Sequence, residues 1–127
     1  MSSTESVPDI VRRFVIRAID SVAELEALRL LGSNAEQSWE AAQLAERLYI
    51  SPQAATEVLH ALHRHELLTR ERTAYRYQPA SERLSAEVDA LVAAYAKFLI
   101  PITQLIHQKP RPALRGFADA FRLRGER

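Results

Sequence analysis

The chain is short and close to neutral, with 127 residues, 17 basic against 16 acidic side chains, and no cysteine. This length suits one domain with its own core and is too short for two ordinary domains. The lack of cysteine excludes disulfides, thiolate metal sites and cysteine nucleophiles, and it fits a reducing cytoplasm.

The first third of the chain has helical periodicity. Residues 1–7 carry no signal-peptide pattern, and we expect them to form a disordered N-terminus of a cytoplasmic protein without a membrane anchor. Apolar residues then recur at helical spacing from Pro8 to Ile19, and Ser21 with Glu24 predicts a capping box for a helix over 22–31. We expect Ser38 to cap a third helix over 39–48.

The helix that ends near Leu48 is followed at once by another. Proline is disfavoured inside a helix but suits its first position after a serine cap, so Ser51 and Pro52 predict a new helix over 52–65. After Leu67 the apolar period shortens to two, which predicts a two-stranded hairpin that ends before Pro79.

Two helices joined by a short turn and followed by a small hairpin form a winged helix-turn-helix. The run from Leu44 to Leu62, with Glu66 to Leu68 after it, resembles the MarR-type and related bacterial regulators without a gap. The resemblance covers residues 38–79. It implies a mainly α fold with a small β-hairpin, in which N- and C-terminal helices extend the domain. The alternative is an ordinary helical bundle in which Ser-Pro merely separates two helices.

The resemblance also indicates where the backbone turns. Family members commonly carry glycine where this chain has Tyr49 and Glu66, because both positions tend to need a left-handed conformation. A small residue at Ala45 lets the two helices approach closely, and the apolar Ile50 fills the turn between them. Tyr49 and Glu66 therefore depart from the family pattern at positions that shape the turn geometry.

The resemblance implies a transcriptional regulator whose second helix enters the major groove of double-stranded DNA. The candidate DNA contacts are Ser51, Gln53, Thr56, Glu57 and His60 on this helix and Arg70, Arg72 and Arg76 on the wing. Yet no lysine or arginine lies between Pro52 and His63, although phosphate contacts supply most of the affinity for DNA. The rival interpretation is a winged-helix module that binds another protein and no DNA.

An apolar heptad seam follows the hairpin, on an expected long helix that begins after Ser81 and is kinked near Lys97 by Pro101. The seam consists of Leu84, Val88, Leu91, Tyr95, Phe98, Ile102 and Leu105. It either packs on the N-terminal helices or pairs with a second subunit. We predict a homodimer interface, because the domain has little core of its own to cover so long a seam and family members usually dimerise through their terminal helices.

Most of the excess positive charge lies at the C-terminus, where residues 97–127 hold seven basic and two acidic side chains. We expect residues 109–127 to form a basic tail with a short helix over 113–123. Its apolar face, Leu114, Phe117 and Phe121, would dock on the dimer, while its arginines would be solvated, grip phosphates or meet an acidic protein partner. Residues 8–108 would form the winged helix-turn-helix domain with its dimerisation helices.

Catalytic and metal-binding chemistry are not expected. His60, His63 and His65 are closely spaced, but no cysteine or suitably spaced carboxylate completes a metal site. The chain has no nucleophile elbow, glycine-rich phosphate loop or His-Glu-x-x-His motif. We therefore predict a protein that is not an enzyme and needs no cofactor.

Overall fold

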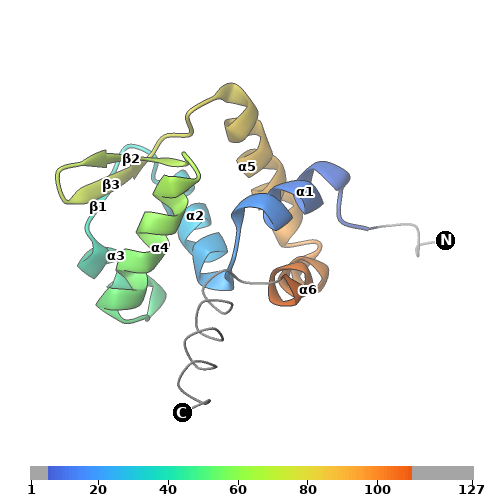
Figure 1. Cartoon of the computed structure of the whole chain (residues 1–127), viewed down its shortest axis with the longest axis horizontal. Coiled ribbons are helices and arrows are strands. Elements are labelled where there is room, and N and C mark those ends of the chain that lie inside the picture. The colour runs from blue at the N-terminus through green and yellow to red at the C-terminus, as the bar shows by residue number, and fades with distance from the viewer. Residues whose placement is uncertain (1–5, 110–127) are drawn as a thin grey trace, which may run out of the picture.

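The computed structural model describes residues 6–109, which form six helices and a small three-stranded sheet. The helices are α1 (Asp9–Ala18), α2 (Val22–Ser33), α3 (Ala41–Leu48), α4 (Pro52–Arg64), α5 (Glu82–Tyr95) and α6 (Leu99–Gln108); the strands are β1 (Ser38–Trp39), β2 (Leu68–Glu71) and β3 (Ala74–Tyr77). Figure 1 shows α3, α4 and the sheet on one side of α2, and α1, α5 and α6 on the other. The predicted winged-helix fold is confirmed.

Serine caps define the beginnings of three helices, as the sequence predicts for α2 and α4. The Ser51 hydroxyl accepts a hydrogen bond from the Ala54 amide at 3.0 Å, and Pro52 occupies the first position of α4. In α2, Ser21 accepts in the same way from the amide of Glu24. The Glu24 carboxylate accepts from the amide of Asp20, one residue before the cap, at 2.8 Å.

The expected cap at Ser38 was wrong. Ser38 and Trp39 form β1, which pairs antiparallel with β3 and gives the sheet the order β1-β3-β2. Helix α3 therefore begins two residues later, where Glu40 provides the cap and its amide donates to the Gln43 side chain at 2.8 Å. The extended conformation of Ser38 and Trp39 is favoured over a helical start because it buries Trp39 in the core. It also supplies β3 with a second set of ladder hydrogen bonds.

The expected long helix is two helices, α5 and α6, whose axes differ by 120°. Pro101 lies in the first turn of α6, where its missing N–H would have no partner within the helix. The proline therefore opens a new helix rather than kinking an existing one. Among the described residues no single helix is both long enough and apolar enough to cross a membrane. Only the bent pair α5 and α6, taken together, has that length and composition.

The apolar seam is covered largely by its own chain. Helix α1 packs on α5 and α6, and Val88, Leu91, Tyr95 and Ile102 are no more than 5% exposed. The other seam residues, Leu84, Phe98 and Leu105, are half-buried against the same core. The seam therefore packs on the N-terminal helix of its own chain, which was one of the two alternatives. A second subunit would have to contact the residues beside the seam.

Polar contacts join the elements at two further points. The Tyr95 hydroxyl donates to Glu26 at 2.9 Å and so attaches α5 to α2; burial and this carboxylate raise the pKa of Tyr95 to about 12. The Lys109 ammonium, with a side chain only 10% exposed, donates to the carbonyls of Val15 and Ile19 at 3.0 and 2.7 Å and pairs with Asp20 at 2.9 Å. The end of α6 is thereby fixed to the end of α1.

The predicted terminal segments fall mostly outside the described residues. Of the expected disordered N-terminus only Ser6 and Val7 are described, and Val7 packs against the core. The predicted basic helix over 113–123 lies entirely beyond the last described residue, Lys109.

Candidate nucleic-acid interface

The turn between α3 and α4 has the backbone that the resemblance implies. Tyr49 and Glu66 have φ angles of 59° and 66°, so both adopt the left-handed backbone that family members commonly give to glycine, although neither is a glycine. The Ile50 amide donates to the carbonyl of Ala45 at 3.1 Å, which closes the turn and leaves the Tyr49 side chain 94% exposed. Helix α4 consequently leaves the turn with its N-terminal residues at the surface.

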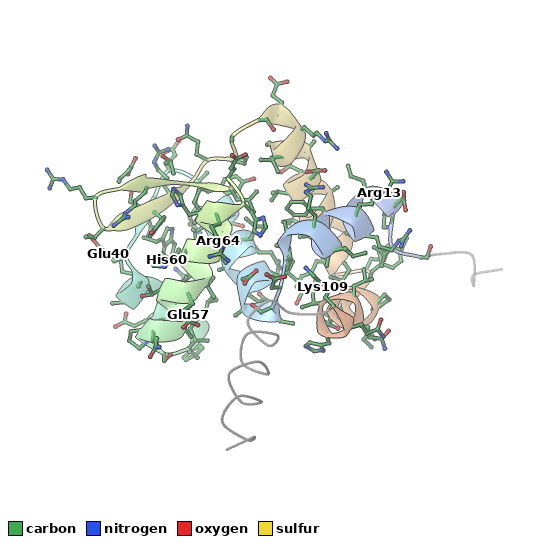
Figure 2. All side chains as sticks on the ribbon, in the orientation of Figure 1. Arg13, Glu40, Glu57, His60, Arg64 and Lys109 are labelled. Carbon is green, nitrogen blue, oxygen red and sulfur yellow. The ribbon has the colours of Figure 1, made fainter. Side chains whose placement is uncertain are left out.

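Helix α4 has one buried and one exposed side. Ala55, Val58 and Leu62 face the core, whereas Gln53, Glu57 and His60 are exposed. Figure 2 shows Glu57 and His60 along the helix and Arg64 at its end. Two of the predicted contacts are already used within the helix, because Ser51 is its cap and the Thr56 hydroxyl donates to the Pro52 carbonyl at 3.0 Å. Gln53 and Glu57 are thus the freest candidates for base contacts, whereas the exposed His60 also contacts the wing.

An aromatic cluster holds the wing against α4. The buried ring of Tyr75 on β3 meets the rings of His60 and His63 edge-on, with centroids 6.2 and 5.4 Å apart. The Arg70 guanidinium lies over the same ring, 5.9 Å from its centroid. His63 and Tyr75 were not among the predicted site residues; their only sequence signal was the histidine spacing on α4 and the apolar alternation of the strand.

The three predicted wing arginines have different environments. Arg76 is paired with Glu71 through contacts of 2.8 and 2.9 Å, and Arg70 donates to the carbonyl of Arg72 at 2.8 Å. The hydrogen bond from Ser38, followed by that from Arg76, lowers the pKa of Glu71, which therefore stays ionised and neutralises Arg76. Arg72, at the hairpin tip with a φ of 62°, is exposed and has no charged or hydrogen-bonding partner for its guanidinium within residues 6–109.

The hairpin tip is attached to the beginning of α3. The Thr73 hydroxyl donates to the Glu40 carboxylate at 2.8 Å, and on the same side of the sheet Ser38 donates to Glu71. These contacts join residues 33 positions apart, so sequence spacing gave no indication of them. Ser38, Glu40 and Thr73 therefore position the wing, a role that the sequence analysis did not assign.

The histidine cluster divides between two surfaces. His60 and His63 face the wing, whereas His65 lines a cleft of about 460 Å³ between α1, the end of α4 and the start of α5. Burial lowers the pKa of His65 below its ordinary value. Across the part of the chain that the structure describes, no three histidine, aspartate or glutamate side chains are grouped so as to hold a metal ion.

Comparison with known proteins finds a family model that matches part of this architecture. Residues 21–74 match the model of the MarR family, from the cap of α2 to the first residue of β3. No curated protein matches the chain. It is similar to a solved structure titled "Structure of Lactococcus lactis ZitR, wild type", with 24% identity over 82% of this chain and 71% of that chain, and a TM-score of 0.46.

Proposed function

We propose that this MarR-like winged-helix protein is a cytoplasmic, DNA-binding regulator of transcription in a bacterium and that it acts as a homodimer. The observation that carries the proposal is the exposed N-terminal half of α4 beside a wing whose tip presents the unpaired Arg72 within the described chain. A major groove accepts such a helix, and a cation at the tip of a wing can reach the adjacent backbone or minor groove. Residues 8–108 form the DNA-binding domain in this proposal.

The free side chains on α4 define which bases can be read. Gln53 can pair with the edge of adenine, and the Glu57 carboxylate can accept from the amino group of cytosine. His60 extends the same exposed side, and the Thr56 methyl group remains available for thymine because only its hydroxyl is occupied. Ser51 lies where the exposed amides at the start of α4 favour a phosphate. Arg70 and Arg76 complete the wing surface. Arg72 is the wing arginine whose guanidinium has no partner among the described residues.

Exposed apolar side chains on the flanking helices support a dimer. Ile10 and Ile16 on α1, Val92 on α5, and Leu99 and Ile100 on α6 are between 38% and 65% exposed. Large apolar side chains that are exposed at the surface favour a subunit interface. We therefore place the second subunit over α5 and α6 beside the half-buried Leu84, Phe98 and Leu105.

A second candidate function is a winged-helix module that binds a protein and no DNA. Two observations favour it: α4 has no lysine or arginine between Pro52 and His63, and Glu71 neutralises Arg76. A surface with so few free cations would have low non-specific affinity for DNA.

Salt-dependent binding to a random-sequence duplex separates the two functions. A DNA-binding protein should lose affinity steeply with salt, with a log-log slope of about −0.9 for each phosphate contact. The triple Arg70→Ala, Arg72→Ala, Arg76→Ala variant should flatten this slope by about two contacts rather than three, because Arg76 is already paired. Arg13→Ala on α1, remote from the wing (Figure 2), is the matched control. No binding at low salt would leave the protein-interaction module as the better assignment.

A further inference from the structure

A groove of about 550 Å³ runs between the beginning of α2 and one side of α4. Its apolar lining comes from small side chains and one valine: Ala23, Ala54, Val58 and Ala61. Its polar lining consists of Asp20, Ser21, Glu24, Glu57, His60 and Arg64. Figure 2 shows that Glu57, His60 and Arg64 follow one another along α4. The groove therefore lies directly beside the side chains proposed to read DNA.

The lining of this groove carries more negative than positive charge. Three carboxylates, those of Asp20, Glu24 and Glu57, stand against the single guanidinium of Arg64. Because Lys109 pairs with Asp20 from outside and burial raises the pKa of Glu24, Glu57 is the carboxylate of this lining that stays available for a cation. Glu57 is exposed and has no ion-pair or hydrogen-bond partner among the residues that the structure describes. A basic ligand with an apolar side would complement both the lining and its charge.

The chain itself supplies such a ligand at the edge of the groove. Lys109 is held by Asp20, a lining residue, and the 18 residues that follow include five arginines and two acidic side chains. Leu114, Phe117 and Phe121 recur at helical spacing in that segment. Leu114 lies five positions after Lys109, and five residues span at most about 17 Å. The apolar residues of the segment can therefore reach the groove without any change at Lys109.

We propose that residues 110–127 dock into this groove of their own chain, with Leu114, Phe117 and Phe121 against the alanines and Val58 and with arginines beside Glu57. A tethered segment has an effective concentration of the order of millimolar, so a weak contact is enough to keep the groove occupied. The docked segment would cover Glu57 and His60 and so compete with DNA for α4. This consequence for DNA rests on the proposed function, whereas the docking does not.

The absence of cysteine gives a direct test of the docking in the full-length chain. A single Ala54→Cys substitution places a thiol in the groove, and Ala90→Cys places a matched, similarly half-buried thiol on α5. The reaction of each thiol with a disulfide reagent is measured with the native segment and with Phe117→Glu and Phe121→Glu. Release of a segment held by about 1.4 kcal/mol should speed the reaction at position 54 about tenfold and leave position 90 unchanged.

Equal rates at position 54 with the native and the substituted segment would overturn the docking. Protection that increases with protein concentration would also overturn it, because the occupant would then be a second copy. Circular dichroism checks that each variant is folded, and Ala23→Cys, on the α2 side of the groove, is the second probe if the Ala54→Cys variant is not folded. In the same variants, release of the segment should tighten binding to a DNA duplex. Thiol release without any DNA binding would reject the proposed function alone, whereas DNA binding without thiol release would reject the docking alone.

Discussion

The hydroxyl of Thr73 at the tip of the hairpin donates a hydrogen bond of 2.8 Å to Glu40, the residue that caps α3. Helix α3 packs closely on α4. The contact therefore fixes the neighbouring Arg72 at a set position relative to the helix proposed to enter the major groove. The geometry of the wing depends on a residue outside the hairpin.

Removing this contact should weaken DNA binding without unfolding the protein. Thr73→Val keeps the shape of the side chain and removes the donor, and a hydrogen bond of this kind contributes about 0.5–1.5 kcal/mol. We expect the Kd for DNA, measured by fluorescence anisotropy, to rise by about two- to tenfold. Glu40→Gln retains an acceptor and should change the Kd less. Equal affinity of Thr73→Val and the wild type would show that the wing is positioned by other contacts.

The wing arginines should contribute unequally. Arg72 has no partner for its guanidinium in residues 6–109, whereas Arg76 is paired with the ionised Glu71. Arg72→Ala should therefore reduce the salt slope of DNA binding by about one, and Arg76→Ala should reduce it by less. Titrations of the two variants at several salt concentrations measure the difference. A larger effect from Arg76→Ala would mean that Glu71 releases it when DNA binds.

A charge on α6 should dissociate the proposed dimer. Ile100 is 65% exposed in the first turn of α6, where an aspartate is compatible with the helix. Ile100→Asp should therefore keep its helical circular dichroism and sediment as a monomer at concentrations where the wild type is a dimer. Ala42→Asp, an exposed position on α3, is the control and should remain dimeric. A monomeric wild type would contradict the prediction at the outset.

The stability of the protein should fall as the pH is lowered through the histidine range. Burial lowers the pKa of His65 from 6.5, so its neutral form is favoured in the folded state and its contribution is present above pH 6.5. The charges around it are those of Asp20, Arg64, Lys109 and Arg17. Below pH 6.5 the unfolded chain binds the proton more readily, and the unfolding free energy decreases. Urea denaturation measures the unfolding free energy at pH 7.5 and 5.5. Its decrease between these pH values should be smaller for His65→Gln than for the wild type. For His107→Gln, on the exposed side of α6, the decrease should equal that of the wild type.

Features set by local chemistry were predictable from the sequence. Three such features depend on residues within a few positions of one another. They are the serine cap and proline that begin α4, the capping serine of α2, and the alternation of the hairpin strands. The family pattern marks two positions as commonly left-handed, and the structure shows this backbone at Tyr49 and Glu66 although both residues depart from the usual glycine.

Features set by contacts between distant segments were not predictable. Whether Ser38 caps a helix or extends the sheet depends on its pairing with Arg76, 38 positions later. Pro101 could have kinked one helix or opened another, and packing of α6 on α1 decided between them. Likewise, the neutralisation of Arg76 depends on Glu71 being held by Ser38 from another strand.

Strand β3 is the middle strand of the sheet, between β2 of the hairpin and β1, which leads directly into α3. Helix α4 and the wing are consequently connected through both α3 and the sheet. This part of the domain is joined to α5, through α2, by the bond between Tyr95 and Glu26. In the dimer proposed above, this bond would link the helices of the subunit interface to the half of the domain proposed to bind DNA.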